Sequence, residues 1–159
     1  MAGATEARDP CVVRCLPLIA VVLVLPATAS AGTVKTSFNA KLKQTILVDA
    51  RGRTLYLFTE DKGDSSPACY RNLPAPGCGK EWPALLAPVT AGHGVKASLR
   101  GTEKRRDGSL QATYGGYPLY TYAGSKDDGP GDTKPGDLRG QGLYDRWWAV
   151  APSGKPVRH

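Results

Sequence analysis

The chain has 159 residues, the length of one domain. Its 19 glycines and 13 prolines are too many for a largely helical protein and suit short strands joined by turns, yet they fall short of a disordered composition. The formal net charge of +7 admits an anionic partner.

Residues 1–31 predict a secretory signal peptide that is cleaved on export. Leu16–Leu25 is an uninterrupted apolar run, with arginines before it and small residues after it that offer cleavage sites ending at Ala29 or Ala31. The run is too short to cross a bilayer, which takes about 20 apolar residues. We therefore expect an extracytoplasmic, secreted or cell-envelope protein with no stable membrane span after cleavage.

Export also separates the four cysteines. Cys11 and Cys15 leave with the signal, so Cys69 and Cys78 remain in an oxidising compartment, where a disulfide is the default expectation. A metal site is the weaker alternative, because such sites usually need four ligands. A lipid anchor is not expected, because no cysteine follows the apolar run until Cys69.

The folded domain is expected over 45–159, after a flexible polar lead-in at 32–44. Residues 45–48 and 54–58 are strand candidates, and turn residues at 49–53 join them into a β-hairpin. In the second strand, leucines alternate with aromatic residues, so both faces carry apolar bulk. This strand is therefore predicted to be central and covered on both sides.

A second hairpin is predicted over 96–114, with an Asp-Gly turn at 107–108. Several basic residues gather in it and form a candidate patch for an anionic envelope polymer, the alternative being a solvated face: Lys96, Arg100, Lys104, Arg105 and Arg106. On an exported protein, nucleic acid is not the expected partner, whereas another envelope protein is.

The chain also repeats itself at an offset of 64 residues, over 45–88 and 110–152. The shared pattern is a glycine, then Leu-Tyr-x-aromatic, then a tryptophan shortly before Ala-Pro. Its residues are Gly52, Leu55, Tyr56, Phe58, Asp61 and Trp82 in the first copy, and Gly116, Leu119, Tyr120, Tyr122, Trp147 and Trp148 in the second. Two copies are too few for a solenoid. We expect two pseudo-symmetric β-hairpin units packed into one mostly β domain with little helix.

These motifs resemble a known family. Tyr56–Asp61 matches Tyr-x-(Phe/Trp/Tyr)-x-x-Asp, the mark of the secreted-repeat family of predicted bacterial lipoproteins, and Cys78–Pro83 and Gln111–Tyr120 resemble its later segments. The resemblance covers about 45–154 and implies a cell-envelope location without an established biochemical activity. Two departures stand out: Ser125 occupies the place of the second motif aspartate, and extra residues at 134–139 lengthen the loop that follows.

The candidate chemistry has a plain structural alternative in each case. Asp61 could be a ligand or base, but an aspartate after a strand more often caps a turn. The repeated aromatics could line a ligand cleft, but they more often form the core. The aspartates of the 124–142 loop could hold calcium, but solvated turns are favoured.

No nucleophile–histidine, zinc-protease or phosphate-loop motif occurs in the chain. The sequence therefore predicts a non-catalytic binding or structural module without a cofactor. A metal- or redox-associated envelope protein is the alternative.

Overall fold

The computed structural model describes residues 32–62 and 77–158, together with Met1 and Gly3. The predicted signal peptide and Cys69 lie outside the described residues. In the described part, no helix has the length and apolar character needed to cross a membrane.

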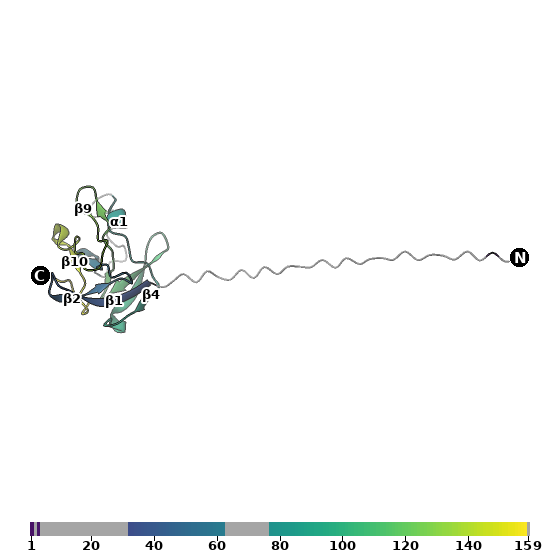
Figure 1. Cartoon of the computed structure of the whole chain (residues 1–159), viewed down its shortest axis with the longest axis horizontal. Helices are drawn as coiled ribbons and strands as arrows, with labels where there is room; N and C mark the ends of the chain where they lie inside the picture. Colours follow the sequence, from purple (N-terminus) through teal and green to yellow (C-terminus); the bar gives the residue numbers. More distant parts are fainter. Residues whose placement is uncertain (2, 4–31, 63–76, 159) are drawn as a thin grey trace.

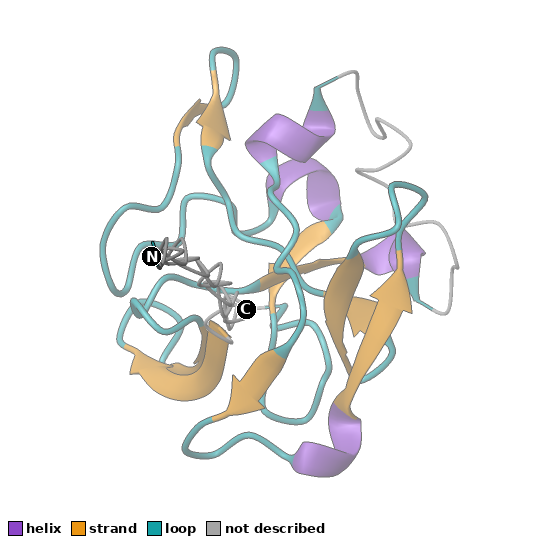
Figure 2. Ribbon diagram, turned by 90° about the vertical axis from the view of Figure 1, so that its right-hand side faces the viewer, coloured by secondary structure: helices purple, strands orange, loops and turns teal. Residues whose placement is uncertain are grey.

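Short strands joined by long loops make up most of the regular structure (Figure 2). The strands are β1 (Gly32–Asn39), β2 (Gln44–Val48), β3 (Tyr56–Phe58), β4 (Val89–Ala91), β5 (Arg100–Lys104), β6 (Leu110–Tyr114), β7 (Tyr117–Pro118), β8 (Gly124–Ser125), β9 (Gly129–Pro130) and β10 (Trp147–Ala149). The helical turns are η1 (Thr59–Asp61), α1 (Cys78–Glu81), η3 (Ala97–Leu99) and η4 (Leu143–Asp145). The prediction of a mostly β domain with little helix is confirmed for this part of the chain.

The strands form four small sheets, in the orders β2-β1-β4, β10-β3, β5-β6-β7 and β8-β9. In Figure 1, β1, β2 and β4 lie on one side of the domain, and α1 and β9 lie on the opposite side. Strands close in sequence do not always pair, because β3 forms its ladder with β10 near the end of the chain.

The first strand occupies a segment for which the sequence predicts a flexible lead-in. β1 pairs antiparallel with β2 and parallel with β4, so both of its edges carry backbone hydrogen bonds. Val34 and Asn39 are buried. The polar composition misled the sequence prediction, because most of what holds this strand is backbone pairing with two neighbours.

The predicted turn after β2 forms around Asp49. Its carboxylate accepts the backbone N–H groups of Arg51 and Arg53, both at 2.9 Å, and its own N–H donates to the Arg53 carbonyl. Gly52 adopts a positive φ of 82°, a conformation that glycine takes at little cost. Val48 and Thr54 pair across this turn, and Leu55 N–H donates to the Leu47 carbonyl.

β5 and β6 pair antiparallel, with Arg100 opposite Tyr114 and Lys104 opposite Leu110. The connection closes with the Arg105 N–H donating to the Ser109 carbonyl at 2.8 Å. A charged turn is therefore held at the tip of this hairpin.

β3 separates two apolar clusters. Tyr56 and Phe58 belong to one, and Leu55 and Leu57 belong to the other, as the alternation along the strand predicts. All four side chains are buried. The second motif copy divides in the same way, with Tyr120 and Tyr122 in the first cluster and Leu119 in the second.

Candidate functional site

The central tyrosines of the two motif copies lie side by side. Tyr56 N–H donates to the Tyr120 carbonyl and Tyr120 N–H donates to the Tyr56 carbonyl, both at 2.9 Å, in an isolated antiparallel bridge. Segments 64 residues apart are thus joined through equivalent atoms. This bridge brings the two motif copies together at the centre of the domain.

Each tyrosine also reaches a carboxylate from the other motif copy. Tyr56 Oη donates to Asp132 Oδ2, and Tyr120 Oη donates to Asp61 Oδ2, both at 2.6 Å. All four residues are buried. Burial, followed by the charge of the partner aspartate, raises the pKa of both tyrosines well above the usual value. The phenols therefore remain protonated and act as donors.

These contacts correct the expectation for Asp61. Its carboxylate bonds a distant phenol, and η1, in which it lies, has no side-chain cap. They also locate the counterpart that the sequence comparison missed. Ser125 stands at the offset position, but Asp132, seven residues later, makes the equivalent bond to Tyr56.

The predicted aromatic residues pack around these pairs. The Trp82 and Trp147 rings stack with centroids 3.8 Å apart and planes 2° apart. Tyr56 packs edge-on against Trp82 at 5.4 Å, and Tyr120 packs in the same way against Trp147 at 5.1 Å. Because these rings are almost fully buried, they form the core of the domain and not the walls of an open cleft.

The predicted basic patch is smaller than the sequence suggests. Lys96, Arg100, Lys104 and Arg106 are exposed. Arg105 turns inward, and its Nη1 donates to Gln111 Oε1 at 2.6 Å while 11% of its side chain stays exposed. The sequence places Arg105 among the free cations because it cannot show that a buried glutamine lies opposite.

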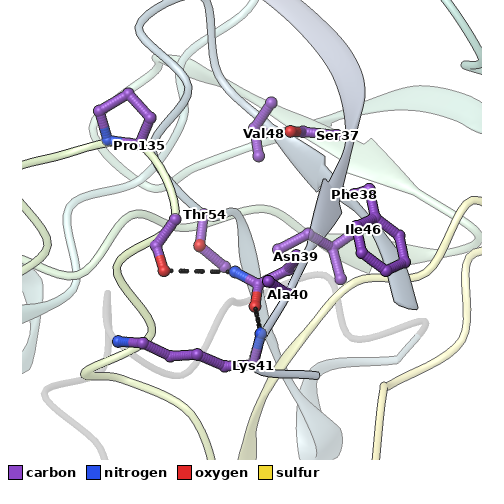
Figure 3. A pocket seen from close by; sticks show the side chains of 10 residues that line it. Ser37, Phe38, Asn39, Ala40, Lys41, Ile46, Val48, Thr54 and Pro135 are labelled. Atoms are coloured by element: carbon purple, nitrogen blue, oxygen red, sulfur yellow. Dashed lines mark hydrogen bonds between the residues drawn. The ribbon is translucent and has the colours of Figure 1, made fainter. Parts of the chain in front are cut away.

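A groove beside β1 was not anticipated, since the sequence predicts a lead-in there. Its volume is about 330 Å³, and Phe38, Asn39, Ile46 and Pro135 help to line it. Figure 3 shows Phe38 and Ile46 on one side and Pro135 on the other, with Asn39 between them. Phe38 is 66% exposed, an unusual position for a large apolar side chain. This groove is a candidate binding surface of the domain.

The Asn39 side chain holds the groove together. Its Nδ2 donates to the Gly136 carbonyl, and its Oδ1 accepts the N–H groups of Lys41 and Leu42 (Figure 3). Gly136 belongs to the extra loop at 134–139, so the departure from the family pattern builds one wall of the groove.

An acidic pocket of about 270 Å³ lies between α1, the β8–β9 hairpin and η4. Glu81, Asp127 and Asp128 line it, and the hydroxyls of Ser125 and Tyr144 donate to Asp128 Oδ2. Over the described residues, no group of three or more His, Cys, Asp or Glu side chains is arranged to hold a metal ion. The calcium hypothesis therefore gains no support from this loop.

The acidic pocket predicts a pH-dependent stability. Burial, and then hydrogen bonding to Asp128, raise the pKa of Glu81 to about 7. The folded state thus holds this proton more tightly than the unfolded chain, where the pKa is near 4.5. The contribution is full below pH 4.5 and is lost as the pH rises through 7. We expect the melting temperature to fall over this interval.

Glu81→Gln should remove this part of the pH dependence, because glutamine keeps the shape and cannot ionise. Melting curves recorded from pH 4.5 to pH 8 on both proteins provide the check. Lys80→Gln, in the same pocket, serves as the control. Parallel pH profiles for wild type and Glu81→Gln would contradict the assignment.

Residues 101–151 match the model of a protein family described as a secreted repeat of unknown function. The match covers the β5–β6 hairpin, the second motif copy and β10. Searches of curated proteins and of solved structures found no match.

Proposed function

From the match of residues 101–151 to a secreted repeat, we propose that this chain is an exported cell-envelope protein whose β domain is a non-catalytic binding or structural module. The observation that carries the proposal is the internal use of the motif. Tyr56 and Tyr120 spend their hydroxyls on Asp132 and Asp61 within the core. Side chains bonded to one another in this way are not free to act on a substrate.

The duplication is a proposal of the same kind, and several contacts support it. Leu85 N–H donates to the Leu119 carbonyl, and in the other half Val150 N–H donates to the Leu55 carbonyl. Matched partners in these pairs lie 64 or 65 residues apart. The stacked tryptophans and the bridged tyrosines obey the same rule. We infer two related units, about 45–88 and 110–152, packed about an approximate twofold axis.

The disulfide also stays a proposal. Cys78 is buried in the aromatic cluster, which suits a bridged cysteine, and its expected partner Cys69 lies outside the described residues. Closing so short a loop contributes roughly 2–3 kcal/mol in the loop-entropy model.

An anionic envelope polymer is the partner that we favour. Arg100 and Lys104 lie on one face of β5, because they are an even number of residues apart. Arg106 follows in the exposed turn. These cations, on a chain of net charge +7, would attract a polyanion in a salt-dependent way.

The test measures retention of the full-length exported protein on phosphocellulose. Lys104→Glu/Arg106→Glu should elute at a clearly lower salt concentration than wild type. The matched control, Lys126→Glu/Lys155→Glu, changes the net charge equally at exposed sites outside the hairpin and should elute later than the hairpin variant. Equal elution of the two variants would show that only net charge matters.

The alternative, a metal- or redox-associated protein, is separated by a second measurement on the same preparation. Metal analysis and a visible absorption spectrum are recorded before any chelator is added. Stoichiometric metal or a cofactor band would overturn the preference for a binding or structural module.

A further inference from the structure

Four aromatic rings form a continuous path through the core. The path runs from Tyr56 to Trp82, then to Trp147 and Tyr120, with centroid separations of 5.4, 3.8 and 5.1 Å. The central pair is stacked in parallel, the arrangement in which two π systems overlap most. An electron vacancy created on one ring can therefore be shared with or passed to the next.

Both ends of this path carry a built-in proton acceptor. Tyr56 donates to Asp132 and Tyr120 donates to Asp61, both at 2.6 Å. A phenol that loses an electron becomes a strong acid, so oxidation is easier when a base already holds its hydrogen bond. Desolvation raises the pKa of the Asp132 carboxyl, which makes its carboxylate a better base than an exposed one.

The middle of the path lacks such acceptors. The indole Nε1 atoms of Trp82 and Trp147 are buried and have no hydrogen-bond partner in the described part of the chain. A buried donor without a partner is uncommon and calls for a reason. An oxidised indole here could not pass its proton to a neighbour, so the vacancy would move on to a tyrosine.

Packing alone does not require these phenol–carboxylate pairs. A buried carboxylate is costly, and apolar residues of similar volume often serve stability as well or better. The two pairs are nevertheless built from different loops, since Asp61 follows Tyr56 by five residues and Asp132 follows Tyr120 by twelve. The same geometry reached through different spacings indicates that the pair itself is what matters.

We infer that this core is a one-electron redox site in which Tyr56 or Tyr120 is oxidised to a neutral tyrosyl radical. The electron leaves to a one-electron oxidant, and the phenolic proton passes to the bonded aspartate. With tris(bipyridine)ruthenium(III) as oxidant, phenol, carboxylate and ruthenium(III) give tyrosyl radical, carboxylic acid and ruthenium(II). This property goes beyond the binding role proposed above and does not depend on it.

Tyr122 provides the route from the surface. Its ring lies 4.4 Å from that of Trp82, and its hydroxyl donates to the Asp128 carbonyl at 3.4 Å. Asp128 lines the acidic pocket, where a cationic ruthenium complex is attracted.

Flash-quench oxidation of the full chain, followed by transient absorption and freeze-quenched electron paramagnetic resonance, tests the inference. Wild type should give a tyrosyl radical that forms more slowly in D₂O than in H₂O. Tyr56→Phe/Tyr120→Phe should lose the signal. Asp61→Asn/Asp132→Asn keeps the side-chain shape but removes the bases, so the radical should form about 100-fold more slowly.

Tyr117→Phe/Tyr144→Phe, which removes two tyrosines outside the ring path, is the matched control and should retain the signal. Loss of the signal in this control, or a wild-type rate in a folded Asp61→Asn/Asp132→Asn protein, would overturn the inference. The isotope measurement needs no variant, so it decides the matter even where the core variants do not fold. A rate that is equal in H₂O and D₂O would count against coupled proton transfer.

Discussion

Trp82→Ala is expected to lower the free energy of unfolding by about 3–5 kcal/mol, a large share of the total stability of a small domain. The side chain is 1% exposed, stacks on Trp147 and contacts the rings of Tyr56 and Tyr122. Alanine leaves a cavity that a close-packed core fills only in part. Urea unfolding followed by far-ultraviolet circular dichroism measures the change.

Leu86→Ala is the control for this prediction. Leu86 is 52% exposed, so the same kind of truncation should change the stability by no more than about 0.5 kcal/mol. A Trp82→Ala protein as stable as Leu86→Ala would show that the tryptophan stack does not hold the domain together.

Tyr56→Phe is expected to cost about 2–3 kcal/mol, because it removes a donor from a buried carboxylate while the ring remains. Asp132 would keep the Arg139 N–H as a donor to its other oxygen but would lose the 2.6 Å bond from the phenol. Tyr144→Phe removes an exposed hydroxyl that also bonds an aspartate, and should cost less. Chemical denaturation of each variant supplies the comparison.

A double-mutant cycle separates the pair from the rest of the core. The loss in Tyr56→Phe/Asp132→Asn should be smaller than the sum of the two single losses, because either substitution alone already breaks the bond. Strict additivity would mean that the Tyr56–Asp132 contact contributes no coupling energy.

Local patterns in the sequence account for much of the fold. The alternation of Leu55, Tyr56, Leu57 and Phe58 predicts a strand covered on both faces, and those side chains divide between two clusters. Turn chemistry around Asp49 predicts the first turn of the domain. These predictions succeed because they depend on backbone preferences and on neighbouring residues alone.

Long-range partners were beyond such patterns. The lead-in prediction for 32–44 was wrong over β1, since β4, which pairs with it, lies more than fifty residues away. Arg105 appeared to be a free cation until Gln111 was found opposite it. Gly140 carried no sequence signal, yet a Cβ there would lie 2.7 Å from the Trp82 ring.

By itself, the sequence determined a β-rich domain whose two motif copies carry equivalent tyrosines, and the expectation of export. Only the tertiary structure decided that Asp132, and not the residue at the offset position, pairs with Tyr56. The reason is physical. A strand's alternation is set by its own backbone geometry, whereas a hydrogen bond between distant loops depends on where the whole chain has brought them.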